Sequence, residues 1–440
     1  MPCAFRNTFC SIFRFSFRFE LNLFKRNMSS SPVAVNSLLE IVKKRPLSDS
    51  KEEPAHKKAH VDFERVKRKK YAVLLAYSGQ GYLGMQRNPG RKTIEEDLLC
   101  AMQKAGYISD DAFTTPQTIQ FQRAARTDKG VSAARQVVSV KLPEEVSVEK
   151  INEHLQEQIR VLSIKRTTKG FNSKSSCDAR TYSYTLPTFA FTPADMELKE
   201  DYCMSSEVLA SVNSTLKIFE GTHNFHNFTS RKRPLDPSAH RYIMSFECGK
   251  PFHRKGMEFA SIKIKGQSFM LHQIRKMVGL AIAIARGLTT TDTITKAWKS
   301  ERLDIPVAPS LGLVLEEVHY DRYNQRYGAD GIHERLDWSE VEDELNKFRE
   351  KHIYPQIVDT ELGEKSMYNW LLTLPFHSYD VRDSSVSGLP QATSDDEDDD
   401  EVPPTSVDNV KNDGSVGDKN NDDKRNTILN GDTSAPPSSN

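Results

Sequence analysis

Residues 67–330 combine two apolar periodicities, and this combination limits the fold classes open to the chain. Strand-like segments, either continuously apolar or alternating with period two, fall at 71–77, 136–142, 178–186 and 258–265. Helical spacing appears between them, at 94–105, 150–158, 207–219 and 268–286. Strands and helices do not alternate strictly, and alternating strands suit an antiparallel sheet with one covered face. The sequence therefore predicts an α+β fold.

Two of the expected helices have clear end signals. Thr93 and Glu96 have the spacing of a capping box, and Gly106 marks the end of that helix. The segment Ser268–Arg286 is the strongest helix, because its apolar residues share one face and Gly287 follows it. That apolar stripe consists of Leu271, Ile274, Val278, Ala281, Ile282 and Ala285.

Composition excludes several classes of protein. The longest apolar run, Gly279–Ala285, is far shorter than the roughly 18–20 residues that a membrane span needs. The six cysteines include no CxxC pair, so they indicate reduced thiols rather than a disulfide framework or a zinc site. We expect no contact with a membrane and no bound metal.

Charge is segregated along the chain. The formal net charge is +1, yet residues 381–440 carry five basic and fourteen acidic residues, a net charge of −9. The remaining residues, 1–380, therefore carry +10. A basic body suits a protein that binds a polyanion, although solvated surface charge explains such a balance equally well. The polar tail 381–440 has too little apolar surface to order itself, so we expect it to be disordered.

The first 66 residues have the character of a targeting segment rather than of a folded domain. Residues 1–27 are rich in arginine and poor in acids, as mitochondrial transit peptides are, and Met28 offers a second start. Basic clusters at 43–46 and 67–70 are typical of nuclear import signals. Together these features predict two products, one in the mitochondrion and one in the nucleus.

A literal GxGxxG motif spans Gly79–Gly84 after the first expected strand. In a dinucleotide-binding fold the glycines lead directly into a helix, so that the pyrophosphate meets the helix N-terminus. Here nine residues separate Gly84 from Ile94. A glycine-rich turn is thus favoured over a dinucleotide-dependent oxidoreductase.

The segment around Asp128 has the strongest chemical character. This carboxylate is surrounded in sequence by Arg123, Arg126 and Lys129. Basic neighbours favour the ionised form of a carboxylate, which can act as a nucleophile at a sugar carbon or stabilise an oxocarbenium-like centre. The alternative is an ordinary salt bridge in a loop, and the residues alone do not decide between the two.

Arg126-Thr-Asp-Lys-Gly-Val131 resembles the signature loop of the TruA family of tRNA pseudouridine synthases. Four further segments match that family in chain order. They are residues 77–87, 179–184, 269–279 and 311–315, so that the resemblance covers about residues 70–320. Lys129 and Ser132 stand where bacterial members carry Ala and His, which is similar to the eukaryotic branch.

The resemblance implies a role for five residues. Asp128 would be the catalytic aspartate that helps to break the C1′–N1 bond of a uridine. Tyr182 would stack on the target base, and Leu313 would line the floor of the pocket. Arg275 would pair with Asp128, and Arg126 would contact the RNA backbone or hold the flipped base. No metal, nucleotide or redox cofactor is implied, and His223, His226 and His272 are expected in the core or against RNA.

The resemblance also implies an architecture and a substrate. Two ferredoxin-like halves, 67–205 and 206–330, would share a central antiparallel sheet flanked by helices, with a helical extension over 331–380. The substrate would be tRNA, with small nuclear RNA and mRNA as further substrates of the eukaryotic branch, and the extra segments favour a monomer. A catalytically silent RNA-binding protein or tRNA chaperone with the same fold is the alternative.

Overall fold

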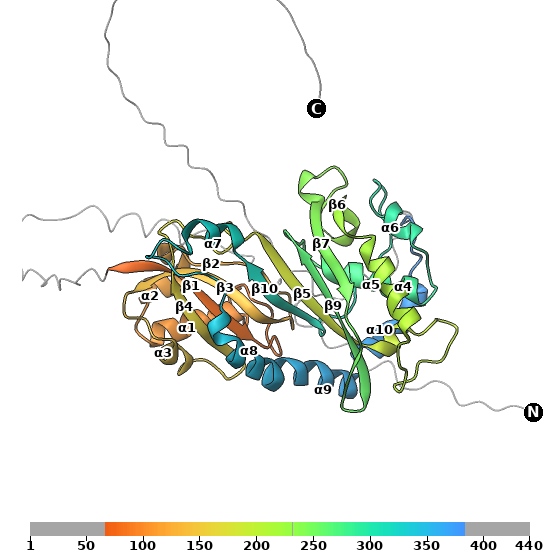
Figure 1. The fold of residues 1–440 in the computed structure, drawn as a ribbon, viewed down its shortest axis with the longest axis horizontal. Coiled ribbons are helices and arrows are strands. Elements are labelled where there is room, and N and C mark those ends of the chain that lie inside the picture. Colours follow the sequence, from red (N-terminus) through yellow and green to blue (C-terminus); the bar gives the residue numbers. More distant parts are fainter. Residues whose placement is uncertain (1–66, 231, 383–440) are drawn as a thin grey trace, which may run out of the picture. The chain divides into compact units, whose positions relative to one another are not determined.

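The computed structural model describes residues 67–230 and 232–382, and Figure 1 shows their arrangement. The expected targeting segment 1–66 and nearly all of the acidic tail lie outside the described residues. The tail was expected to begin at residue 381, but Val381 still forms a β-bridge with Leu303. In the described part of the chain, no helix combines the length and the apolar character that crossing a membrane requires.

The described residues are organised around one ten-stranded sheet with the order β4-β1-β3-β10-β5-β9-β7-β6, with β2 beside β3 and β8 beside β9. The strands are β1 (Arg68–Tyr77), β2 (Gln122–Arg123), β3 (Ser132–Pro143), β4 (Ile159–Arg166), β5 (Ala179–Pro187), β6 (Gly221–Asn224), β7 (His240–Cys248), β8 (Phe252–Arg254), β9 (Met257–Gly266) and β10 (Leu313–His319). The strands expected from the apolar pattern all lie within this sheet.

The sheet is mixed, which corrects the expectation of an antiparallel sheet. β10 runs parallel to β3, through the pairs Val314–Ser132 and Leu315–Ala133, and antiparallel to β5. A parallel neighbour needs a long crossover connection, and β10 enters the centre of the sheet only after the long segment that contains α5. Alternation of side chains gives the faces of a strand but not its direction, so the sequence pattern could not reveal this pair.

Ten α-helices accompany the described strands: α1 (Ile94–Lys104), α2 (Asp110–Thr114), α3 (Val148–Asn152), α4 (Ser206–Lys217), α5 (Gln273–Ala285), α6 (Asp292–Lys296), α7 (Asp321–Tyr327), α8 (Glu342–Phe348), α9 (Tyr354–Glu364) and α10 (Ser366–Leu371). Short 3₁₀ turns occur at 116–119, 188–191, 226–228, 237–239, 339–341 and 374–376, and a π turn at 349–353 joins α8 to α9. α4 packs on β7 and beside α5, as Figure 1 shows.

The structure confirms the expected start of α1 and shifts the expected start of α5. Thr93 caps α1, its hydroxyl accepting from the backbone N–H of Glu96 at 3.4 Å, while the Glu96 carboxylate pairs with Arg87. α5 was expected to start at Ser268 but begins at Gln273. The reason is His272, whose φ of +58° lies in the left-handed region and therefore interrupts the helix.

The helical extension covers the second face of the central strands. Leu345, Phe348, Ile353 and Ile357 form a separate apolar cluster with Ala76, Ala134 and Val314. The neighbours of these strand residues along β1, β3 and β10 point into the main core instead. The centre of the sheet is thus buried on both faces, whereas the sequence pattern suggested one covered face.

Candidate active site

Asp128 lies in the loop that connects β2 to β3, and α5 brings two basic side chains to it. Its Oδ2 is 3.9 Å from Nη1 of Arg275 and 3.8 Å from Nε2 of His272. The Asp128 side chain is 25% exposed, so it is reachable from solvent without projecting freely into it. A partly desolvated carboxylate beside a guanidinium interacts with it more strongly than a fully exposed ion pair would.

The glycines of the GxGxxG segment shape the backbone against this loop. A Cβ on Gly84, whose φ is +106°, would lie 2.7 Å from the carbonyl oxygen of Thr127. A Cβ on Gly79 would lie 2.4 Å from the carbonyl oxygen of Val131. Two backbone hydrogen bonds join the segments, from Met85 N to Thr127 O and from Gly130 N to Tyr82 O. The motif therefore permits a close backbone approach that positions the Asp128 loop.

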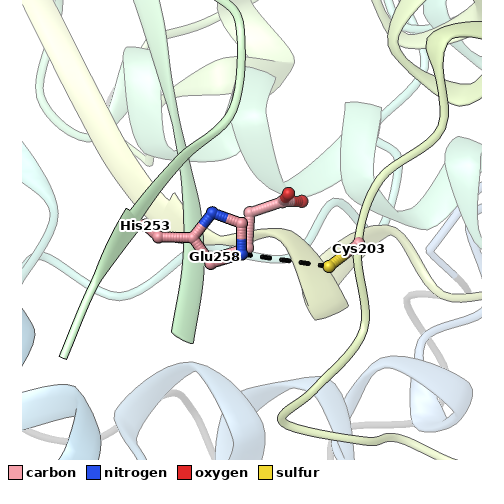
Figure 2. A group of neighbouring side chains, drawn as sticks. All are labelled: Cys203, His253 and Glu258. Atoms are coloured by element: carbon pink, nitrogen blue, oxygen red, sulfur yellow. Dashed lines mark hydrogen bonds between the residues drawn. The ribbon is translucent and has the colours of Figure 1, made fainter. Parts of the chain in front are cut away.

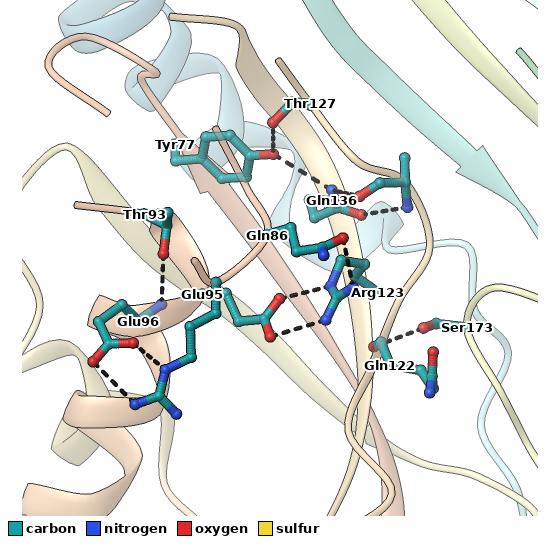
Figure 3. Close-up of polar contacts among 12 residues, drawn as sticks. Tyr77, Gln86, Thr93, Glu95, Glu96, Gln122, Arg123, Thr127, Gln136 and Ser173 are labelled. Carbon is teal, nitrogen blue, oxygen red and sulfur yellow. Dashed lines mark hydrogen bonds and ion pairs between the residues drawn. The ribbon is translucent and has the colours of Figure 1, made fainter. Parts of the chain in front are cut away.

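A buried hydrogen-bond network holds the same loop from the side of β1 and β3 (Figure 3). Tyr77 Oη and Thr127 Oγ1 are 2.8 Å apart, and Gln136 donates to Tyr77 Oη at 3.4 Å. Gln136 also bonds the backbone N–H and C=O of Ala125. Burial raises the pKa of Tyr77 to about 12, so its hydroxyl stays protonated in this network at neutral pH.

Arg275 is itself held in place. Its Nε donates to the carbonyl oxygen of Ala308 at 2.7 Å, and Ala308 N donates back to the carbonyl oxygen of Arg275 at 3.2 Å. With one edge of the guanidinium occupied in this way, the other edge is directed to Asp128. The two hydrogen bonds with Ala308 thus hold the arginine from within the protein.

Tyr182 and Leu313 lie on adjacent strands at the centre of the sheet. Leu315 of β10 is opposite Tyr182 of β5, and Leu313 is two pairs further along, opposite Tyr184. Tyr182 is 94% buried as a residue, and its ring packs edge-on against Phe269, with 5.3 Å between ring centroids. Burial raises the pKa of the Tyr182 hydroxyl, so this group is neutral at physiological pH.

All five site residues expected from the sequence line one cleft of about 1290 Å³. Asp128, Tyr182, Arg275 and Leu313 contribute to it together with the exposed Arg126. Its other basic lining residues are Arg87, Arg123, Lys174, Arg180, Lys232 and Arg241. The acidic Glu95 and Glu96 also line it, but each forms an ion pair with an arginine of the cleft. The cleft is thus positively charged around Asp128, the carboxylate that faces Arg275.

The sequence suggested that Arg123 lies beside Asp128, whereas the structure pairs it with Glu95. Its Nε is 2.6 Å from Oε2 of the buried Glu95, and its Nη1 donates to Gln86 (Figure 3). Arg123 belongs to β2, and its guanidinium is held against α1 by the ion pair with Glu95. His272, which the sequence reasoning did not connect with Asp128, contacts it instead. Its position three residues before Arg275 was the available signal, but the left-handed backbone that orients it was not visible.

Outside this cleft, Cys203, His253 and Glu258 form a group whose potential ligand atoms lie within 4.8 Å of one another (Figure 2). The cysteine and the histidine are exposed, while the buried Glu258 carboxylate accepts from the backbone N–H of Met204 at 2.7 Å. None of the three lines the cleft. Of the histidines considered in the sequence, His226 is buried and His223 stacks on Trp298, with ring centroids 3.8 Å apart.

A basic cleft suits the phosphates of a nucleic acid, and enzymes that act on a base hold it outside its stack against aromatic or apolar side chains. A family model described as tRNA pseudouridine synthase matches residues 216–321. The chain is 54% identical over 321 residues to the mouse protein "Pseudouridylate synthase 1 homolog", covering 72% of this chain and 76% of the relative. Its human counterpart is 53% identical, covering 72% and 75%. "tRNA pseudouridine synthase 1" of Yarrowia lipolytica is 36% identical, covering 69% and 73%.

The chain therefore belongs to the TruA-type family of tRNA pseudouridine synthases, and the protein is an isomerase. The family resemblance found in the sequence is confirmed.

Proposed function

We propose that this enzyme converts uridines of tRNA into pseudouridine with Asp128 as its catalytic residue. The observation that carries the proposal is the position of Asp128 Oδ2, 3.9 Å from Arg275 in a basic cleft lined by a buried tyrosine. In this reaction the C1′–N1 bond breaks, the uracil turns, and a C5–C1′ bond forms. C5 loses a proton and N1 gains one, so that substrate and product are isomers.

Asp128 acts at the sugar of the target uridine. Its ionised carboxylate is directed by Arg275, and that guanidinium is anchored to the carbonyl oxygen of Ala308. In this position the carboxylate reaches C1′ or the neighbouring C2′ proton, so the same geometry serves a covalent adduct and a glycal route.

The base must leave its stack to reach this carboxylate. Tyr182 offers a neutral aromatic surface, and the buried Leu313 next to it gives the floor of the pocket. Arg126 is exposed two residues before Asp128, where it contacts the RNA backbone beside the extruded nucleotide. The remaining cleft arginines and lysines bind phosphates.

We extend the proposal to the partners and the location of the enzyme. Phosphate contacts carry no sequence information, which supports small nuclear RNA and mRNA as substrates beside tRNA. The extension that covers the back of the central strands supports a monomer. The arginine-rich start and the basic cluster at 43–46 support a mitochondrial and a nuclear product. The second basic cluster, 67–70, gives less support, because it runs into β1 and Lys70 is buried there.

The test is Asp128→Asn, assayed by release of tritium from C5-labelled uridine in tRNA. We expect turnover to fall by more than about 1,000-fold, because the amide cannot supply a negative charge, while the Kd for tRNA stays within several-fold. A catalytically silent RNA-binding protein would release no tritium even with Asp128 intact. Retained turnover in the variant would remove Asp128 from the catalytic role.

A further inference from the structure

We infer that Gln356, on α9 of the C-terminal extension, is a positioning residue that fixes the Asp128 loop from behind the sheet. The inference rests on the proposed role of Asp128. Gln356 lies outside the segment that the family model matches, and it lines no part of the cleft. Its amide oxygen bonds Ser78 and Ser132, and an effect on the reaction would pass through these two groups.

One oxygen of Gln356 receives two buried hydroxyl groups from different strands. Ser78, directly after β1, donates to Gln356 Oε1 at 2.7 Å, and Ser132, the first residue of β3, donates to the same oxygen at 3.0 Å. Both serines are at least 97% buried. The amide oxygen therefore links the two chain segments that enter the active-site loops.

The serine oxygens are already occupied as acceptors. Ser132 Oγ accepts the backbone N–H of Gly79 at 3.0 Å, and Ser78 Oγ accepts that of Gln80 at 3.4 Å. Each hydroxyl proton is thus directed to another acceptor, and Gln356 Oε1 provides it for both. Without that oxygen, two buried donors lose their partner, and leaving a buried donor without an acceptor costs free energy.

Ser132 is connected to Asp128 through a short stretch of backbone. Ser132 follows Val131, whose N–H donates to the carbonyl oxygen of Asp128 at 3.1 Å and whose own carbonyl oxygen lies against Gly79. Gln356 thus joins Gly79, Ser132 and the C-terminal end of the Asp128 loop into one unit. The packing of α9 supports this, since Ile353 and Ile357 flank Gln356 and insert between Ala76, Ala134 and Val314.

The experiment compares variants of the full-length enzyme in single-turnover tritium release from C5-labelled tRNA, with tRNA Kd and Tm measured on the same preparations. Gln356→Met keeps the side-chain length and helix propensity but removes the acceptor. We expect the single-turnover rate to fall by about 10- to 100-fold, because small misplacement of a reacting group is enough for such losses. The Kd for tRNA should change by less than about twofold, since the cleft cations are untouched.

Two further variants separate positioning from simple destabilisation. Gln356→Glu retains an oxygen acceptor for both serines and should restore most of the rate. Ile357→Val, the next residue of α9, trims the buried packing without touching the hydrogen bonds, so it should lower Tm while leaving the rate unchanged. A similar loss of rate in Ile357→Val, or a normal rate in Gln356→Met, would overturn the inference.

If Gln356→Met does not fold, a serine variant still tests the inference. Ser132→Ala removes one of the two donors, together with the acceptor of the Gly79 N–H, without altering α9. It should lower the rate with little effect on Kd, and a normal rate would again overturn the inference. Failure of the proposed function has a different signature, because it would show as retained activity in Asp128→Asn.

Discussion

At the scale of single residues, the chemistry of the cleft depends on which cations reach Asp128. Arg123 is close in sequence but is paired with the buried Glu95, whereas Arg275 is remote in sequence but lies 3.9 Å from the carboxylate. Arg275 also has a second partner within the protein, the carbonyl oxygen of Ala308. An arginine fixed in advance costs no reorganisation when the reaction begins.

Arg275→Ala should therefore lower turnover more than affinity. We expect a loss of about 100-fold in turnover, the range seen when one preorganised charge-stabilising donor is removed, with a tRNA Kd changed by less than about threefold. Tritium release and filter binding on the same variant give the two numbers. A loss confined to Kd would assign Arg275 to RNA binding instead.

At the scale of elements, the loop between β1 and α1 supports the neighbouring loop that carries Asp128. Its glycines allow the backbone to lie against the carbonyl oxygens of Thr127 and Val131. Similarly, α9 reaches the loop through Gln356 and two buried serines. The Asp128 loop is thus supported by a neighbouring loop on one side and by the extension on the other.

Gly84→Ala tests this close approach, with Gly81→Ala as its matched control. Both glycines have positive φ, +106° and +77°, but a Cβ on Gly81 would meet nothing within 4 Å, whereas one on Gly84 would lie 2.7 Å from Thr127 O. We expect Gly81→Ala to lower the free energy of unfolding by about 1 kcal/mol through backbone strain and to leave turnover unchanged. Gly84→Ala should lower it by more than about 2 kcal/mol and should also reduce turnover.

Denaturant unfolding and tritium release on both variants provide the comparison. Equal effects on stability and rate in the two variants would show that the steric contact with Thr127 is unimportant for the loop.

At the scale of the whole molecule, the central position of β10 brings the parts of the site together. Through its parallel pairing with β3 it lies beside the strand that leaves the Asp128 loop, and through its antiparallel pairing with β5 it lies beside Tyr182. β5 in turn lies between β10 and β9. The two ferredoxin-like halves and their boundaries at 67–205 and 206–330 stay predictions, while the sheet that joins these segments is continuous.

From the basic lining of the cleft we predict how the affinity for tRNA depends on salt concentration. Binding of tRNA should weaken steeply with ionic strength, as phosphate neutralisation releases counterions. Lys174→Gln, an exposed lining position, should reduce the slope of log K against log salt by about one. Lys199→Gln, an exposed lysine outside the lining, serves as the control and should leave the slope unchanged. Equal slopes for the unmodified enzyme and both variants would show that the RNA binds outside this cleft.

The sequence alone determined several of the elements and singled out the candidate site residues of this protein. Periodicity places β1, β3, β5, β9 and α5, because burial of one face imposes a repeat that is visible in the chain. The local motif around Asp128, with the other family segments, singled out Asp128, Tyr182, Arg275, Arg126 and Leu313, and the structure brings all five to one cleft.

Tertiary structure decided what depends on pairing across long distances in the chain. Strand direction, the contact of His272 with Asp128, the pairing of Arg123 with Glu95 and the reach of Gln356 to Ser132 have no local signature. Each of these contacts joins residues from separate elements, and side-chain periodicity records only which face is buried, not which element covers it.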